Sequence, residues 1–153
     1  FRSALRNAGY RLAILSDSWP SLRNLLRELE LDTYFDAIII SAEVGVTKPD
    51  LLMYQTACQE LGLPPEQLLF VDNHPLNVEG AQQAGMQAVL LDRDGIYTGL
   101  GWPNTIATLT QLLGRRAAGG RRRSQAGPPA LAIITGLTGY FKDLAVHNQR
   151  LTD

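Results

Sequence analysis

Asp72 and Asn73 directly follow the apolar run "LLFV", and Asn77 comes five positions after Asp72 in "DNHPLN". Carboxylate and amide oxygens are hard ligands of the kind that Mg²⁺ prefers. A proline and a helix of small residues come next, so these polar groups stand where a buried strand gives way to a helix. The residue types therefore predict that Asp72 and Asn73 can hold a metal ion.

Two other segments carry groups that suit a phosphate oxygen. Ser16 and Asp17 end the apolar run "RLAIL", and Lys48 stands before a proline in "VGVTKPD". A hydroxyl beside backbone N–H groups at a helix start binds an anion, and a lysine adds a positive charge. Together with a carboxylate, these groups are suited to binding a phosphoryl group and its metal.

Short β-rich runs alternate with amphipathic helical patterns over residues 11–92. The runs are apolar throughout, which is typical of strands that are buried on both faces of a parallel sheet. The pattern predicts an α/β fold, a three-layer Rossmann-like parallel sheet, in which the polar residues after each strand meet at one edge. The predicted strands are residues 11–16, 37–41, 68–73 and 88–92.

Helical spacing and capping residues predict where the helices lie. Apolar residues recur at i, i+3, i+4 and i+7 from Leu22 and again from Tyr54. Prolines stand near the expected helix starts and glycines at the expected ends. A last core helix is expected at residues 104–113, capped by Asn104.

The chain divides into three parts by composition. Residues 1–113 form the predicted core domain, residues 114–129 read as a flexible linker rich in arginine and glycine, and residues 130–153 form a short extension of unknown role. The arginine run favours a solvated linker over a nucleic-acid site, and nothing in the sequence indicates an oligomeric state.

The totals exclude several function classes. The 153 residues are 45% hydrophobic and 19% charged with a net charge of −1, as in a soluble globular protein without a global field for nucleic acid or membrane. The single cysteine, Cys58, forms no internal disulfide, and no apolar stretch is long enough to span a bilayer. A cytoplasmic protein is therefore expected.

Each candidate residue also has a purely structural interpretation. The serines at 16 and 18 could cap a helix, and Asp72 with Asn73 could do the same before Pro75. A lysine before a proline is most often a surface residue. The functional interpretation depends on the combination of these groups at one edge.

In order and spacing, "LAILSDS", "VGVTKPD" and "LLFVDNHPLNVEGAQQAGM" resemble motifs two, three and four of the haloacid dehalogenase-like hydrolase superfamily. The resemblance covers residues 1–113. It implies that Ser16 and Asp17 bind the transferring phosphoryl group and that Lys48 neutralises it. It also implies that Asp72 and Asn73 hold Mg²⁺, while Asn77 braces their loop.

The chain departs from the family pattern in two places. Phosphatase-like members often have two consecutive acids where this chain has Asp72 and Asn73. An amide offers an oxygen but no charge, so the resemblance leaves the magnesium affinity open. The D-x-D motif on the first, central strand is absent, and with it the nucleophilic aspartate, so we expect a fragment with a gap in its sheet. Two alternatives address this gap: a permuted nucleophile at Asp92 in "AVLLDRDG", or residues 131–135 as a substitute strand.

The resemblance implies a Mg²⁺-dependent phosphatase acting on a small phosphorylated substrate, with this chain inactive alone. One alternative is a metal-independent 2-haloacid dehalogenase, and another is an inactive module that binds or scaffolds. The substrate itself is not indicated, because the cap region that selects it in the family is absent from this sequence.

Overall fold

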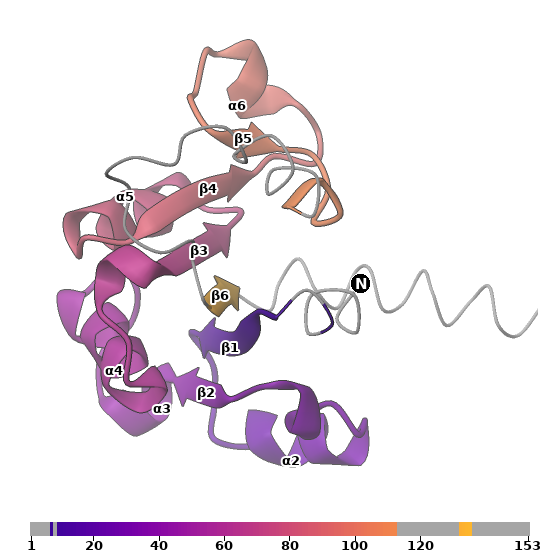
Figure 1. Ribbon diagram of the computed structural model, residues 1–153, viewed down its shortest axis with the longest axis vertical. Helices are drawn as coiled ribbons and strands as arrows, with labels where there is room; N and C mark the ends of the chain where they lie inside the picture. The colour runs from indigo at the N-terminus through magenta and orange to yellow at the C-terminus, as the bar shows by residue number, and fades with distance from the viewer. Residues whose placement is uncertain (1–6, 8, 113–131, 136–153) are drawn as a thin grey trace, which may run out of the picture.

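The computed structural model describes residue 7, residues 9–112 and the backbone of residues 132–135 (Figure 1). In this part of the chain six strands form one sheet in the order β2-β1-β6-β3-β4-β5, and every neighbouring pair is parallel. The strands are β1 Arg11–Ser16, β2 Ala37–Ile40, β3 Leu68–Asp72, β4 Gln87–Leu91, β5 Thr105–Ile106 and β6 Ala132–Thr135. The predicted α/β class with a parallel sheet is confirmed.

The four strands predicted from apolar runs are present with small shifts at their ends. β1 has the predicted bounds, β3 ends one residue before the predicted end, and β4 begins and ends one residue before its predicted bounds. The second run ends one residue early because Ser41 already begins α3 Ser41–Val44. Continuous apolar composition therefore located each strand of the core.

The described helices lie on both faces of the sheet. They are α2 Leu22–Glu28, α3, α4 Leu51–Leu61, α5 Pro75–Gln83 and α6 Ile96–Gly99, with 3₁₀ turns η1 Asp32–Tyr34 and η2 Pro65–Gln67. The helices α4 and α5 cover one face, and α2 packs Leu22 and Leu26 against Ile14 and Ile40 on the other. The result is the predicted three-layer arrangement.

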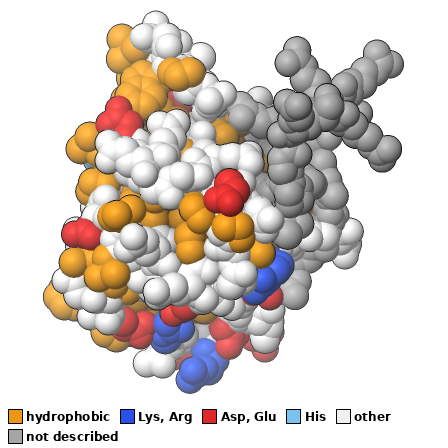
Figure 2. All heavy atoms as spheres, turned by 60° about the vertical axis from the view of Figure 1, so that its left-hand side comes forward, with side chains coloured by type: hydrophobic (Ala, Val, Ile, Leu, Met, Phe, Trp, Pro, Cys, Tyr) orange, Lys and Arg blue, Asp and Glu red, His pale blue; other side chains and the backbone are white. Residues whose placement is uncertain are grey.

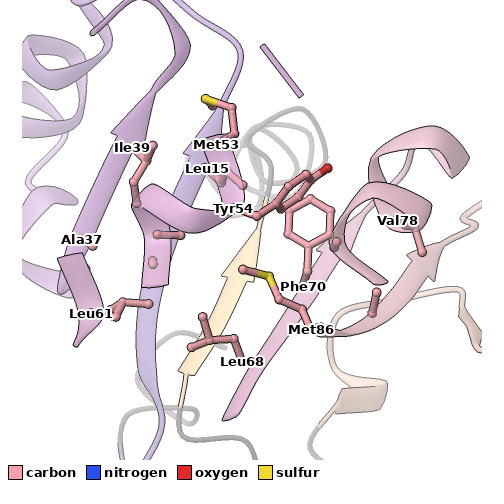
Figure 3. Packing of buried hydrophobic residues seen from close by; sticks show 14 of the residues in the cluster. Leu15, Ala37, Ile39, Met53, Tyr54, Leu61, Leu68, Phe70, Val78 and Met86 are labelled. Carbon is pink, nitrogen blue, oxygen red and sulfur yellow. The ribbon is translucent and has the colours of Figure 1, made fainter. Parts of the chain in front are cut away.

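One hydrophobic cluster joins the two halves of the sheet. It combines Ala13 and Leu15 of β1 with Phe70 of β3, and α4 contributes Met53 and Tyr54 (Figure 3). Side chains from α5 and β4 complete the same cluster. Because α4 contacts both β1 and α5, these helices hold the strands on the two sides of β6 in one core.

The helix predicted at residues 104–113 is wrong for residues 104–110, whereas Gln111 and Leu112 are helical. Thr105 and Ile106 form β5, whose backbone extends the sheet: the N–H of Leu90 donates to the carbonyl of Asn104 at 3.0 Å, and the N–H of Asp92 donates to that of Ile106 at 2.7 Å. Ile106 and Leu109 are buried, as expected. Their spacing fits a helix, but pairing with the edge of β4 satisfies the backbone instead. Leu113 lies outside the described residues.

The position between β1 and β3 is filled. β6 pairs with β1 on one side and with β3 on the other, so the sheet has no gap there. The alternative expectation that the segment at 131–135 acts as a substitute strand is confirmed for residues 132–135. The linker at 114–129 and the remainder of the C-terminal extension lie outside the described residues.

The surface of the described part carries separate apolar side chains between charged ones. Hydrophobic side chains are spread over the face shown in Figure 2, and acidic and basic groups lie near each other at its lower end. The large exposed hydrophobic residues include Trp19, Leu76 and Leu100. Among the described residues no helix has the length and apolar character needed to cross a membrane.

Candidate functional site

Lys48 and Asp72 form a buried ion pair at the carboxyl edge of the sheet. The ammonium Nζ of Lys48 lies 2.8 Å from Oδ2 of Asp72, and the two side chains are only 5% and 4% exposed. The ammonium also lies 5.8 Å from the ring centroid of Phe70. A buried charge without a partner would destabilise the fold, so each of the two side chains holds the other in place. The interpretation of Lys48 as a surface residue is wrong.

The loop after β3 holds the carboxylate of Asp72 from two further directions. The backbone N–H of His74 donates to Oδ1 at 3.0 Å, and the side-chain amide of Asn77 donates to Oδ2 at 3.3 Å. Asn77 is the third residue of α5, which begins at Pro75, so the start of this helix sets the position of the Asn77 side chain. Asp72 thus both terminates β3 and orders the turn, but no side chain caps α5, whose N-cap is His74.

Asp17 connects the end of β1 to the loop between α3 and α4 that carries Lys48 (the lysine loop). Its Oδ1 accepts a hydrogen bond from the backbone N–H of Lys48 at 2.9 Å. The neighbouring Ser18 donates its backbone N–H to Oγ of Ser41 at 2.9 Å, which joins the ends of β1 and β2. Helix α2 begins only at Leu22, with Ser21 at its N-cap, so the serines after β1 do not cap it. These residues bind loops together at the predicted edge.

Ser16 lies on the same edge but across the position of β6. Ile14 of β1 and Val71 of β3 are level with each other, because both pair with Thr135. Ser16 comes two residues after Ile14 and is buried, and Asp72 comes one residue after Val71. Two strand spacings of about 4.8 Å each separate β1 from β3. The structure therefore brings Lys48, Asp17, Asp72 and Asn77 into contact, while Ser16 ends β1 on the same edge of the sheet.

Tyr54 belongs to the site, although the sequence pattern indicated only a core position for it. Its hydroxyl donates to the backbone carbonyl of Asn77 at 2.7 Å, and its ring packs edge-on against Phe70 with centroids 5.4 Å apart (Figure 3). Burial raises the pKa of this phenol far above its ordinary value, and the negative charges of Asp72 and Asp17 raise it further. The signal in the sequence that could have indicated this role was a tyrosine on the apolar face of a helix, six residues after Lys48.

Helix α5 approaches the lysine loop closely at Gly80. A Cβ atom at this position would lie 2.8 Å from Cβ of Pro49 and 2.8 Å from the hydroxyl of Tyr54. Real Cβ atoms do not approach other heavy atoms this closely, so only glycine fits. The glycine lets Pro49, Tyr54 and the helix that carries Asn77 pack together beside the ion pair.

Asp92 has a different environment from Asp72. Its Oδ2 accepts hydrogen bonds from the backbone N–H and the hydroxyl of Thr98, each at 2.7 Å, and Thr98 also contacts Thr105 at 2.9 Å. Burial of the carboxyl acts to raise its pKa, but the hydrogen bonds from Thr98, Tyr97 and Ile96 outweigh it and lower the pKa. Asp92 therefore stabilises the turn into α6, which argues against a permuted nucleophile.

The residues at the end of β3 are of types that magnesium accepts. Asp72 offers a carboxylate, and Asn73, which is exposed, offers an amide oxygen on the next residue. No group of three histidine, cysteine or acidic residues able to hold a metal ion occurs in the part of the chain that the structure describes. Magnesium commonly keeps several waters and binds through one or two carboxylates and a phosphate, so the remaining ligands would be water and substrate.

The chain is similar in sequence to known hydrolases. A family model described as haloacid dehalogenase-like hydrolase matches residues 2–85. The (S)-2-haloacid dehalogenase 4A of Burkholderia cepacia is 34% identical over 92 residues, which are 60% of this chain and 40% of that protein. The phosphoserine phosphatase of Thermus thermophilus is 38% identical over 95 residues, 61% of this chain and 38% of that protein. The chain thus spans about 40% of the length of these curated relatives.

Solved structures show the same fold. A HAD phosphatase from Thermococcus onnurineus superposes with a TM-score of 0.67 and 30% identity over 79% of this chain and 56% of that one. A dehalogenase crystallised with an intermediate superposes with a TM-score of 0.65 and 28% identity, over 74% of this chain and 52% of that one. Phosphatases and dehalogenases are both among the relatives. The family match over more than half of its length shows that this chain belongs to the haloacid dehalogenase-like hydrolases.

Proposed function

We propose that the chain carries the lysine-side and metal-side walls of a Mg²⁺-dependent phosphatase site that acts on a small phosphorylated substrate. The observation that carries the proposal is the buried pair of Lys48 and Asp72, which places an ammonium next to a carboxylate at the sheet's carboxyl edge. Lys48 would bind and neutralise the phosphoryl oxygens, Ser16 would donate its hydroxyl to them, and Asp72 and Asn73 would hold the metal.

The charges of the site favour a metal. Asp72 contacts the ammonium of Lys48 and Asp17 accepts a hydrogen bond from the backbone N–H of the same residue, so this edge carries two carboxylates and one ammonium before any anion arrives. A phosphate group brought to this site adds further negative charge, and a divalent cation would offset it. When bound, Mg²⁺ supplies charge neutralisation and a fixed orientation for the phosphoryl group. The role of Asp17 is to hold the backbone of Lys48 in place.

The second candidate function is a metal-independent 2-haloacid dehalogenase, which the relatives also include. A haloacid carries one carboxylate and would meet the same excess of negative charge without a cation to offset it. The charge count therefore favours the phosphatase. The third candidate, an inactive binding module, keeps the anion site but has no turnover.

Equilibrium binding distinguishes these functions. Inorganic phosphate and 2-chloropropanoate are titrated into the full chain, each with and without Mg²⁺. The phosphatase proposal expects phosphate to bind at least about tenfold more tightly with Mg²⁺, a coupling of about 1.4 kcal/mol. Tight binding of 2-chloropropanoate that Mg²⁺ does not change, together with no phosphate binding, would overturn it in favour of the dehalogenase.

Turnover is a separate measurement. The strand between β1 and β3 is β6, and its described residues, Ala132–Thr135, include no carboxylate that could act as a nucleophile. The chain alone is therefore expected not to hydrolyse a generic aryl phosphate in the presence of Mg²⁺. Hydrolysis that is lost in Asp92→Asn, with Asp94→Asn unaffected, would instead support a nucleophile at Asp92.

A further inference from the structure

One oxygen of Asp72 receives two hydrogen-bond donors from different parts of the fold. Nζ of Lys48 lies 2.8 Å from Oδ2, and Nδ2 of Asn77 lies 3.3 Å from the same oxygen. The lysine comes from the lysine loop and the asparagine from the first turn of α5. Because 3.3 Å is at the long end of the hydrogen-bond range, a small shift of α5 would break the asparagine contact. The surroundings of Asp72 therefore depend on what holds this turn.

The hydrogen bonds within the turn do not fix α5 against its neighbours. Its first residue, Pro75, has no N–H, and the N-cap residue His74 makes no side-chain capping hydrogen bond. The N–H of Asn77 donates to the carbonyl of His74 at 3.1 Å, which is a contact inside the turn. Among the described residues, α4 supplies a second anchor, because the hydroxyl of Tyr54 donates to the backbone carbonyl of Asn77 at 2.7 Å. This anchor is shorter than the contact of Asn77 with Asp72, so it restrains the turn more strongly.

Packing holds Tyr54 itself in place. Its side chain is fully buried, and its ring meets the ring of Phe70 edge-on with centroids 5.4 Å apart (Figure 3). The ring of Phe70 also faces the ammonium of Lys48, whose Nζ lies 5.8 Å from the ring centroid. On the side of α5, a Cβ at Gly80 would lie 2.8 Å from the Tyr54 hydroxyl, so little space remains for this oxygen to move toward the helix. The hydroxyl that holds Asn77 therefore has a fixed position.

Tyr54 also links the two donors to each other. It lies in the first turn of α4, directly after the lysine loop. Within that loop the N–H of Asp50 donates to the carbonyl of Thr47 at 2.9 Å, and Asp50 is the N-cap of α4. A shift of α4 relative to α5 would therefore move the lysine loop relative to Asn77, and the hydrogen bond from Tyr54 opposes that shift.

We propose that Tyr54 is a positioning residue of the candidate site. Its hydroxyl holds the backbone of Asn77, so that the Asn77 side chain shares Oδ2 of Asp72 with Lys48. The other oxygen, Oδ1, accepts the N–H of His74 and keeps a further acceptor position, which suits a metal ion. The consequence for metal and phosphate binding rests on the proposed function, whereas the role of Tyr54 in the hydrogen-bond arrangement does not.

The chemistry of the phenol suits this role. Burial raises the pKa of Tyr54 far above its ordinary value, and the charges of Asp72 and Asp17 raise it further. The hydroxyl is therefore protonated at neutral pH and donates to the carbonyl. Tyr54→Phe removes this donor and keeps the ring that packs against Phe70, so it is the variant that isolates the hydroxyl.

Solvent exchange of the side-chain NH₂ protons of Asn77, followed by two-dimensional NMR of the full ¹⁵N-labelled chain, tests the role without any ligand. These protons are expected to exchange at least about threefold faster in Tyr54→Phe, because the bond to Asp72 opens more often when the turn loses its anchor. The side-chain amide of Gln87, which donates to the carbonyl of Glu66 at 3.2 Å, is the internal control and should not change.

A second variant separates positioning from a general loss of stability. Leu61 is buried in the same cluster at the other end of α4, so Leu61→Val should lower Tm without acting on Asn77. Exchange at Asn77 that is unchanged in Tyr54→Phe, or that rises as much in Leu61→Val, would overturn the proposal.

Ligand binding tests the consequence for the site. The factor by which Mg²⁺ tightens the binding of inorganic phosphate is measured for the wild type, Tyr54→Phe, Asn77→Ala and the double variant. This factor should be at least about threefold smaller in Tyr54→Phe than in the wild type, and Tyr54→Phe should change nothing further in the Asn77→Ala chain, because the hydroxyl acts through Asn77. An equal loss in both backgrounds would contradict positioning. A wild type without any coupling would contradict the proposed function, and the exchange measurement would still decide the role of Tyr54.

Discussion

Replacing Gly80 with alanine tests the packing that supports the candidate site. Gly80 lies within α5, where alanine is the better helix former by about 0.8–1.0 kcal/mol. Its new Cβ would lie 2.8 Å from Cβ of Pro49, 2.8 Å from the hydroxyl of Tyr54 and 3.1 Å from Cε2 of the same ring. The helix preference and the steric contact therefore act in opposite directions.

The contact should outweigh the preference. Overpacking of a filled core costs about 1–3 kcal/mol, and a displaced Tyr54 would lose its hydrogen bond to Asn77, worth about 0.5–1.5 kcal/mol. The ring of Pro49 has little freedom to move because it is part of the backbone. We expect Gly80→Ala to lower the free energy of unfolding by about 1–3 kcal/mol in net. For a chain of this size, each kcal/mol corresponds to about 2–4 °C in Tm.

Thermal and urea unfolding of the full chain provide the assay, with Gly99→Ala as the matched control. No atom lies within 4 Å of a Cβ at Gly99, so its change should stay within about 0.5 kcal/mol. Tyr54→Phe removes one of the contacting atoms, so the double variant should lose less than the sum of the single losses. A Gly80→Ala chain as stable as the wild type or more stable would refute the reasoning.

Three further predictions concern ionisable groups of the described core. Because the pKa of Tyr54 is raised, the free energy of unfolding should fall as pH rises above about 10, where the unfolded chain ionises this phenol and the folded chain does not. Tyr54→Phe should make this fall shallower. Curves of unfolding free energy against pH that are parallel for the two chains would contradict the prediction. The lowered pKa of Asp92 means that its contribution is present above about pH 4 and is lost as pH falls further; the stability difference between wild type and Asp92→Asn should therefore shrink below pH 4, and a constant difference would count against the capping role. Lys48→Met should cost about 3–5 kcal/mol by leaving Asp72 buried without a counter-charge; the double variant with Asp72→Asn should recover at least about half in urea unfolding, and no recovery would mean that the pair is not coupled.

Sequence patterns located the strands because their physical cause is local. A run such as "AIIIS" places apolar side chains on both faces of a strand, and a strand inside a parallel sheet that helices cover on both sides buries all of them from water. The helix expected at residues 104–113 failed because pairing of Thr105 and Ile106 with β4 depends on a remote neighbour that helical spacing does not register. The placement of β6 likewise depends on β1 and β3, the two strands that it pairs with and that are distant from it in the sequence.

The sequence could point to candidate site residues but not to their geometry. Ser16, Lys48 and Asp72 were found because each follows an apolar strand or stands at a helix entrance. The burial of Lys48 against Asp72 and the contact of Asp17 with the lysine backbone required the fold. Tyr54 was placed in the core, but the reach of its hydroxyl to Asn77 depends on how α4 and α5 pack.

The central claim is that Lys48 and Asp72, together with Ser16 at the end of β1, form a phosphoryl site. A titration of the ¹⁵N-labelled chain with inorganic phosphate and Mg²⁺, followed by two-dimensional NMR, tests it most directly. Saturating shifts are expected at the amides of residues 16–18, 48 and 72–74, stronger with Mg²⁺ than without it. Shifts confined to the arginine run at residues 115–123, or no saturable shift at all, would contradict the claim.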